Sequence, residues 1–128
     1  MADIKEITVN DVVEYEDLAI SVGSGDLEVY STPMVVALME NASAQLASNY
    51  IDDDCTTVGI KINIDHTSAT PLNAKVKATA TLEENTGRKF TFTVVAYDEA
   101  GEIARGTHER VSVKKEKFQD KANNKFKQ

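Results

Sequence analysis

The chain has few of the residues that cross-link or stiffen a small protein: its 128 residues include one cysteine, two prolines and no tryptophan. The single cysteine, Cys55, cannot form an intrachain disulfide, so we expect a reducing compartment such as the cytoplasm. Long hydrophobic runs are also missing. The longest, residues 34–39, is much shorter than the ~20 residues of a membrane span. The N-terminal residues include Asp3 and Glu6 and no apolar core, so we expect neither a transmembrane helix nor a secretory signal.

Basic residues are scarce in the first half of the chain. Residues 1–56 hold twelve acids and a single base, Lys5, and the formal net charge of the whole chain is −7. Residues 114–128 are the exception, with six lysines against two acids, which is typical of a solvated terminal helix or tail. Because one basic tail is not the broad positive surface that a phosphate backbone requires, we expect no nucleic-acid partner. The length fits a single domain over residues 1–128.

The strongest helix pattern begins at Thr32, a good N-cap residue, and Pro33 then suits the first helical position because its missing N–H costs nothing there. The pattern continues to about residue 49. Apolar side chains fall on nearly all sides of this segment, as in a helix buried in a core. They are Met34, Val35, Val36, Ala37, Leu38, Met39, Ala42, Ala44, Leu46 and Ala47. By itself, Thr32 is therefore expected to cap a central helix.

From residue 58 onward, apolar residues recur at every second position, which predicts half-buried strands. The first such strand places one set of side chains on a single face, so the ring of its last member should point inward. That set is Val58, Ile60, Ile62, Ile64 and His66. Further alternating runs lie at 75–82, 90–96 and about 102–113, with turn residues between them, and a weaker early strand is expected near 18–22.

One long buried helix followed by antiparallel strands predicts an α+β fold in which a sheet curls around the helix. A sheet of this kind leaves one face or edge open. Pairing with a second copy of the chain would bury that surface, so we predict at least a two-fold dimer.

Two ionisable residues stand out in apolar surroundings. Glu40 interrupts the buried helix, where it either reaches a polar stripe beside Asn41 and Ser43 or is held in a pocket that tunes its pKa for acid–base work. His66 ends an inward-facing strand face, so it is either a satisfied strand-end histidine or a functional group. Thr32 and Glu40 are eight positions apart, ~12 Å of helical rise, so direct contact is not expected unless a substrate or a dimer interface joins them.

Metal binding is not predicted. His66 and His108 are far apart in the sequence, and no HxH, HxxxH or CxxC spacing occurs. Cys55 follows three aspartates, whose charge opposes thiolate formation, so it is a poor nucleophile.

Four motifs, in order, resemble the hot-dog thioesterases similar to fluoroacetyl-CoA thioesterase. They are YSTPMVVALMENA at 30–42, VGI followed by Asp-His within 58–66, Ala-Thr-Pro at 69–71 and GTHER at 106–110. The resemblance covers nearly the whole chain. It implies the hot-dog fold, in which a curled antiparallel sheet wraps one long central helix and subunits pair as dimers or dimers of dimers.

By position in these motifs, the family's catalytic threonine, glutamate and histidine look like Thr32, Glu40 and His66. Gly59 matches the position whose backbone N–H faces the thioester oxygen, where a missing side chain allows close approach to a developing oxyanion. Arg110 matches an arginine near the site with a positioning role. The resemblance implies His66 as general base or acid, Glu40 as nucleophile or base, and Thr32 as an orienting or attacking hydroxyl.

The implied reaction is hydrolysis of an acyl-CoA thioester, with coenzyme A as part of the substrate and no other cofactor. Family members specific for fluoroacetyl groups have an aromatic-rich lid, whereas residues 11–30 here include only Tyr15 and Tyr30 as aromatics. A short- or medium-chain acyl group is therefore the expected substrate. The alternatives are a non-catalytic acyl-CoA or small-ligand binding protein and a hydratase on the same fold.

Overall fold

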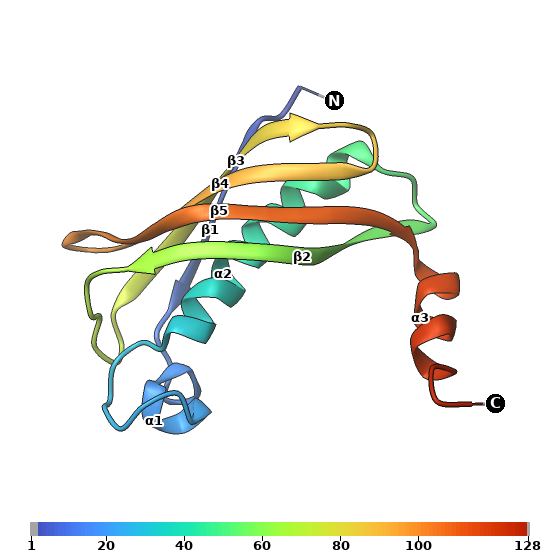
Figure 1. The fold of residues 1–128 in the computed structure, drawn as a ribbon. Helices are drawn as coiled ribbons and strands as arrows, with labels where there is room; N and C mark the ends of the chain where they lie inside the picture. Colours follow the sequence, from blue (N-terminus) through green and yellow to red (C-terminus); the bar gives the residue numbers. More distant parts are fainter. Residues whose placement is uncertain (1–2, 128) are drawn as a thin grey trace.

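The computed structural model describes residues 3–127, and Figure 1 shows a sheet that curves over one long helix. The strands are β1 (Glu6–Val12), β2 (Cys55–His66), β3 (Lys75–Asn85), β4 (Lys89–Asp98) and β5 (Gly101–Lys114). The helices are α1 (Ala19–Val22), α2 (Thr32–Ala47) and α3 (Lys115–Asn123), with 3-10 turns η1 (Tyr15–Asp17) and η2 (Ser48–Tyr50). All neighbouring strands are antiparallel in the order β1-β3-β4-β5-β2, so β1 and β2 form the edges. The predicted α+β fold class is confirmed.

The core lies between α2 and the concave side of the sheet. Seven residues of α2 are buried: Val35, Leu38, Met39, Ala42, Ser43, Leu46 and Ala47. The largest fully buried side chains from the sheet are Phe90 and Phe92 of β4, which expose none of their surface. Burying an apolar side chain of this size contributes about 1.5–3 kcal/mol, so each of the two phenylalanines stabilises the core between the sheet and α2. The helix expected from its apolar pattern is therefore the central element of the core.

The start of α2 differs by one residue from the prediction. Ser31, not Thr32, is the N-cap, and the side-chain oxygen of Ser31 accepts a hydrogen bond from the Met34 N–H at 3.3 Å. The expectation that Thr32 caps the helix is thus wrong. Since Ser31 already has the extended backbone of a cap, with φ −79° and ψ 148°, Thr32 occupies the first helical position and its hydroxyl is free for another partner.

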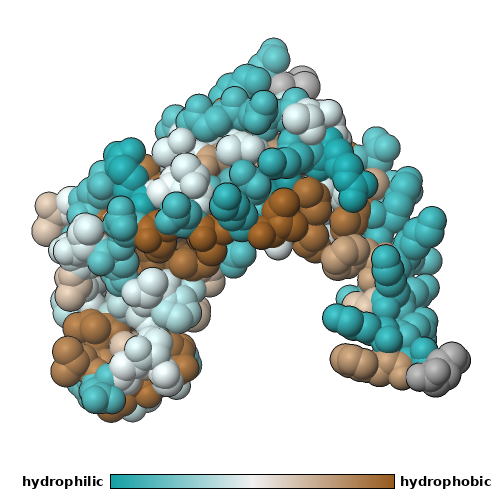
Figure 2. Space-filling view, viewed as in Figure 1, coloured by the Kyte–Doolittle hydropathy of each residue, from teal (hydrophilic) through white to brown (hydrophobic). Residues whose placement is uncertain are grey.

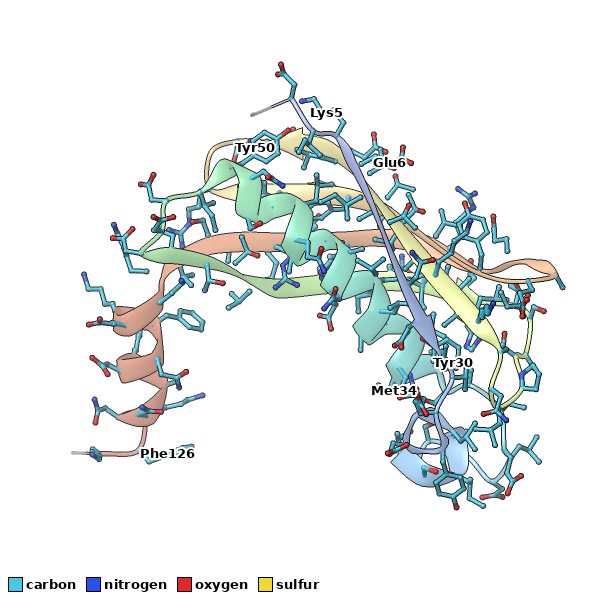
Figure 3. All side chains as sticks on the ribbon, turned by 180° about the vertical axis from the view of Figure 1, so that it is seen from behind. Lys5, Glu6, Tyr30, Met34, Tyr50 and Phe126 are labelled. Atoms are coloured by element: carbon cyan, nitrogen blue, oxygen red, sulfur yellow. The ribbon has the colours of Figure 1, made fainter. Side chains whose placement is uncertain are left out.

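Tyrosines fix both ends of the α2 segment, as Figure 3 shows from behind. At the start, the buried Tyr30 donates its hydroxyl proton to the Met34 carbonyl at 3.4 Å. Beyond the end, the Tyr50 hydroxyl bonds to the Ile4 carbonyl, and the Lys5 ammonium lies 6.0 Å from the centroid of the Tyr50 ring. The Tyr30 bond ties the start of the helix to the residues before it, and the Tyr50 contacts tie the turn after the helix to the residues that precede β1.

Strand β2 is an exposed edge with a bulge in its middle. Gly59 pairs with Arg110 and Lys61 pairs with Glu109, so Ile60 is the extra residue that interrupts the register with β5. Ile60 and Ile62 are 53% and 37% exposed, which contradicts the prediction that they share a buried face with His66. No strand covers this edge within residues 3–127. Ile60 and Ile62 of the alternating apolar set therefore lie on an open surface of the single chain and not in its core.

The N-terminal part of the chain also differs from the prediction. The strand expected near 18–22 is wrong, since Ala19–Val22 form the short helix α1. Adjacent Leu18 and Ala19 are both buried while Ile20 is exposed, which a strand of alternating faces does not allow. Strand β1 was not predicted, and it pairs along its whole length with β3.

The basic C-terminal segment forms α3, which has no buried residues and extends away from the sheet in Figure 1. The expectation of a solvated terminal helix is confirmed for the part of the segment up to residue 127. None of the helices within residues 3–127 has the length and apolarity needed to cross a membrane.

Candidate active site

Thr32 and His66 meet where α2 begins and β2 ends. The distance between Thr32 Oγ1 and His66 Nδ1 is 2.7 Å, which is a short hydrogen bond. Thr32 reaches the ring because Ser31 caps the helix in its place. Two residues that lie 34 positions apart in the sequence are thus joined by the crossing of helix and edge strand.

The other ring nitrogen of His66 has no partner. His66 Nε2 is shielded from solvent and forms no hydrogen bond to any group within residues 3–127. Burial lowers the pKa of His66, an effect only partly opposed by the Ser68 backbone, so the ring is neutral at pH 7. A buried nitrogen without a partner is costly in a folded protein, which makes it a candidate for contact with a ligand.

The Thr32–His66 pair faces a hollow of about 270 Å³. The remaining lining residues come from the segment before α2 and from the loop after β2: Ala19, Ser24, Val29, Tyr30, Ser31, Thr67, Ser68 and Ala69. The hollow therefore combines a hydroxyl, an imidazole and mostly small side chains.

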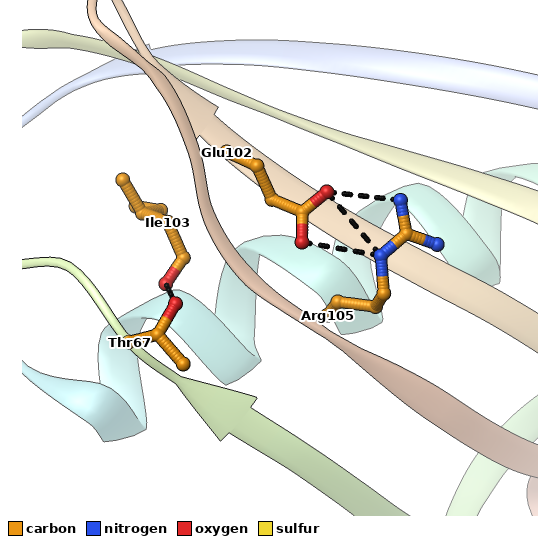
Figure 4. A network of polar contacts seen from close by, with 4 residues as sticks. All are labelled: Thr67, Glu102, Ile103 and Arg105. Carbon is orange, nitrogen blue, oxygen red and sulfur yellow. Dashed lines mark hydrogen bonds and ion pairs between the residues drawn. The ribbon is translucent and has the colours of Figure 1, made fainter.

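The end of β2 is anchored directly after His66. The Thr67 backbone N–H and hydroxyl both donate to the Ile103 carbonyl, at 2.8 and 3.4 Å, and Figure 4 shows the hydroxyl contact. Nearby on β5, the Arg105 guanidinium forms an exposed ion pair with Glu102 at 2.9 Å. The Thr67–Ile103 contacts fix the direction in which β2 ends and hence the position of the His66 ring.

A second cluster surrounds Gly59 in the middle of β2. A methyl group added to Gly59 would lie 2.9 Å from Glu40 Oε2, 3.1 Å from His108 Cε1 and 3.4 Å from Arg110 Nη1. Three ionisable side chains therefore converge on the space that a glycine leaves open. This space belongs to a shallow hollow of about 420 Å³ lined by Ala37, Glu40, Asn41, Ala44, Thr57, Val58, Gly59 and Arg110.

Arg110 is the most constrained member of this cluster. Its Nε donates to Thr57 Oγ1 at 2.8 Å, its Nη2 to the Thr57 carbonyl at 2.9 Å and its Nη1 to His108 Nε2 at 3.2 Å. The residue is only 9% exposed, and this burial lowers the pKa of Arg110, while the charge of Glu40 acts in the opposite direction. The guanidinium is thus held rigidly, with Glu40 as the acid that partly balances its charge.

The structure brings the five predicted site residues together in two groups. Thr32 and His66 form the first group, and Glu40, Gly59 and Arg110 form the second. No hydrogen bond joins the groups within residues 3–127, in keeping with the ~12 Å of helical rise between Thr32 and Glu40.

Sequence reasoning missed His108, which is 1% exposed and lies on β5 two positions before Arg110. Period two in a strand places both side chains on one face, and this was the available signal.

In the described range of 3–127, the structure shows no group of His, Cys, Asp and Glu residues suited to holding a metal ion. The site is thus built of hydroxyl, imidazole, carboxylate and guanidinium groups, together with one glycine.

Comparisons with known proteins identify the family and the fold of this chain. Residues 13–116 match the model of the family "Fluoroacetyl-CoA-specific thioesterase". The fluoroacetyl-CoA thioesterase of Streptantibioticus cattleyicolor is 38% identical over 98 residues, which cover 77% of this chain and 70% of that protein. A solved structure of a variant of the fluoroacetyl-CoA-specific thioesterase, in complex with fluoroacetate and CoA, is 32% identical with a TM-score of 0.84, over 89% of this chain and 96% of that one.

A hot-dog-like protein from Thermanaerovibrio acidaminovorans has the same fold, with a TM-score of 0.85 at 18% identity over 98% of this chain and 94% of that one. The family match spans most of the chain, including α2, all of β2 and the GTHER strand β5. The chain belongs to the fluoroacetyl-CoA-specific thioesterase family and has the hot-dog fold.

Proposed function

We propose that this protein is an acyl-CoA thioesterase that hydrolyses a short- or medium-chain acyl thioester to the free acid and CoA. The observation that carries the proposal is the 2.7 Å contact between Thr32 Oγ1 and His66 Nδ1, with the buried Nε2 of His66 left unpaired. A neutral imidazole held by a hydroxyl is suited to moving a proton to or from a substrate. Family membership and the likeness to a CoA-bound relative support the same activity.

In this reaction a water oxygen forms the new C–O bond to the carbonyl carbon, either directly or by displacing Glu40 from an acyl intermediate. The C–S bond breaks, and a proton from the water balances the leaving thiolate. His66 moves that proton, and Thr32 orients the imidazole through Nδ1. Because burial lowers the pKa of His66, the neutral, proton-accepting form prevails at pH 7. The protonated ring that results is destabilised by burial, which favours rapid donation to the thiolate.

The Gly59 cluster of the second copy in the proposed dimer supplies the groups that act on the acyl carbon, because within one chain ~12 Å of helical rise separates Glu40 from Thr32. Glu40 is the nucleophile or the base for water, and its carboxylate lies beside the open space at Gly59. Gly59 admits the thioester oxygen close to the backbone, where an N–H stabilises developing negative charge. Arg110 places a positive charge beside Glu40, and the charge of Glu40 opposes the lowering of the Arg110 pKa by burial.

A small acyl group fits the hollow at the Thr32–His66 pair, which measures about 270 Å³. The chain offers little aromatic surface over this hollow. Tyr15 is 59% exposed on the 3-10 turn η1, and Tyr30 bonds to the Met34 carbonyl. These features favour a general short- or medium-chain substrate over a fluoroacetyl-specific one.

The active assembly is a homodimer or a dimer of dimers. Strand β2 supports this proposal because it is an unpaired edge with exposed Ile60 and Ile62. Figure 2 shows hydrophobic side chains gathered along the underside of the arch, where Figure 1 places β2. A second copy against this edge would cover the apolar strip and place additional side chains between the Thr32 and Glu40 groups. A light-scattering mass near 14 kDa at micromolar concentration would contradict the dimer.

The first test is free-thiol release from a panel of acyl-CoA esters of increasing chain length, with fluoroacetyl-CoA included. The experiment uses a Cys55→Ser background, because Cys55 is the only cysteine and would itself react with a thiol reagent. His66→Ala and Glu40→Ala are each expected to lower turnover by about 100-fold or more. Asp65→Asn is the matched control, since Asp65 precedes His66 on β2 but points to the exposed side.

Each outcome separates the candidate functions. Hydrolysis by the parent protein and by Asp65→Asn, but not by His66→Ala, would establish the thioesterase. If no ester is cleaved but one raises the unfolding temperature, the protein is a binding module. Loss of an unsaturated acyl-CoA without thiol release would instead indicate a hydratase.

The lone Cys55, which forms no disulfide, supports a cytoplasmic location.

A further inference from the structure

His108 is a buried titratable residue to which the proposed reaction gives no role. It lies in the middle of β5 and is 1% exposed. Its ring stacks against Phe92 of β4, with 6.1 Å between centroids and 29° between planes. Burying an imidazole in this way has a cost unless both ring nitrogens are satisfied.

The hydrogen bonds of His108 define its tautomer. Nδ1 lies 2.8 Å from the Lys61 carbonyl, which can only accept, so Nδ1 carries the proton. Nε2 lies 3.2 Å from Arg110 Nη1, which can only donate, so Nε2 is the acceptor. The ring is therefore neutral, and it can bond to both partners in only one orientation.

These two partners are the structural supports of the Gly59 cluster. Lys61 follows the bulge that begins at Gly59, so the bond to its carbonyl fixes the backbone on one side of Gly59. Arg110 pairs with Gly59 across the β2–β5 ladder, and its guanidinium is held between Thr57 and His108. The Cε1 atom of His108 also forms part of the wall, 3.1 Å from the position that a methyl group on Gly59 would occupy.

A proton on Nε2 would break this arrangement. The charged ring cannot accept from Arg110, and two cations would then face each other in a buried site. The charged groups around the ring are Arg110 and Glu109 on β5 and Glu40 on α2, while β2 contributes the Lys61 carbonyl and β4 the uncharged Phe92. Desolvation is the main effect and lowers the pKa of His108, so the neutral ring is favoured near pH 7.

We propose that His108 is a positioning residue for thioester hydrolysis, which in its Nδ1–H form holds Arg110 and the Gly59 bulge in the geometry that Glu40 and the thioester oxygen require. This role rests on the proposed function. His108 touches neither the substrate nor the reacting atoms. Its effect on the reaction passes through Arg110 and through the backbone at Lys61.

The test compares three variants in the thiol-release assay. His108→Leu removes both hydrogen bonds and should lower kcat by about 100-fold, since small displacements at a reacting centre have effects of this size. KM should change much less. His108→Gln keeps an acceptor for Arg110 and a donor for Lys61, and should restore most of kcat at pH 8. Phe92→Leu is the packing control, because it alters the stacking on the ring but leaves both nitrogen contacts intact.

The pH profile gives a readout that packing alone would not change. On the acid side, log(kcat/KM) of the parent protein should fall with a slope approaching two, because His66 and His108 both lose function on protonation. His108→Gln should reduce that slope to one. A slope unchanged in His108→Gln, or a folded His108→Leu with parental kcat, would overturn the proposal.

Nitrogen NMR of the labelled full-length protein decides the tautomer without any activity measurement and without requiring His108→Leu to fold. The expected result is a proton on Nδ1 and none on Nε2 of His108 at pH 8. The opposite tautomer in an active enzyme would refute the role of His108 alone. Absence of hydrolysis by the parent protein would refute the proposed function, and the positioning role with it.

Discussion

Gly59→Ala is the most informative single change, because it adds one carbon at the point where the Gly59 cluster converges. The new methyl group would lie 2.9 Å from Glu40 Oε2 and 3.1 Å from His108 Cε1. Both distances are shorter than the ordinary van der Waals separation of about 3.5–4.0 Å, so at least one neighbour must move. The backbone at Gly59 does not require a glycine otherwise, since its φ is not positive.

The two neighbours differ in how easily they move. Glu40 presents the flexible end of a side chain that forms no hydrogen bond within residues 3–127, whereas His108 is held through both ring nitrogens. Glu40 should therefore shift by several tenths of an ångström. The clash is then largely relieved, and overpacking of this kind costs about 1–3 kcal/mol of unfolding free energy. The displaced carboxylate loses its alignment with the thioester, and turnover should fall by about 100-fold.

Thiol release and urea unfolding, measured side by side, test this reasoning. Gly25→Ala is the matched control: its added methyl group would meet only Ala19 Cβ, at an ordinary 3.5 Å, so activity and stability should both stay near the parental values. Gly59→Ala should be folded and nearly inactive. Parental turnover in a folded Gly59→Ala would refute the convergence of Glu40 on this position, and a protein too unstable to fold would refute the ease with which Glu40 moves aside.

Four further perturbations are expected to act through other features of the fold. Gly106→Ala would place a methyl group in a severe clash with the Asn63 carbonyl oxygen of β2, so urea unfolding should show a loss of more than about 3 kcal/mol. Burial lowers the pKa of His66 and of His108, so stability is complete above 6.5, their ordinary value, and falls as the pH drops from 6.5 toward the lower folded-state pKa values. Urea titrations between pH 5 and 8 should show this fall, with a slope of at most about 1.4 kcal/mol per pH unit for each histidine. Ser31→Ala should cost about 1 kcal/mol of stability with a small change in turnover. Thr32→Val, which loses the bond to His66, should lower turnover markedly with a small change in stability.

Periodicity predicted the parts of the fold that depend on the long elements. The apolar run of α2 and the alternation in β3, β4 and β5 each identified the element that the structure contains. Strand β1 was missed because it is a short, largely exposed edge strand whose order depends on pairing with β3, some 70 positions away. In β2, alternation was present but its meaning was different, because a bulge at Ile60 and an unpaired edge leave the apolar side chains exposed.

The motifs predicted which residues belong to the candidate site, but not which hydrogen bonds connect them. Nothing in the sequence distinguishes Ser31 from Thr32 as the cap, since both have a hydroxyl and precede the same apolar run. The choice depends on which residue retains extended backbone, and the structure assigns that to Ser31. A shift of one position converts Thr32 from a capping residue into the partner of His66.

The two histidines show why contacts, and not residue type, decide a role at this site. Both lie in β-strands, and burial lowers the pKa of each, so neither pattern nor titration separates them. Their nitrogens do. His108 has a fixed acceptor on one side and a fixed donor on the other, which leaves it no capacity for a substrate. His66 has one nitrogen held by a hydroxyl and the other buried without a partner, so only His66 retains a site for a proton from the reaction. The unpaired nitrogen destabilises the free protein, and a donor that arrives with the substrate, such as the attacking water, regains that free energy on binding.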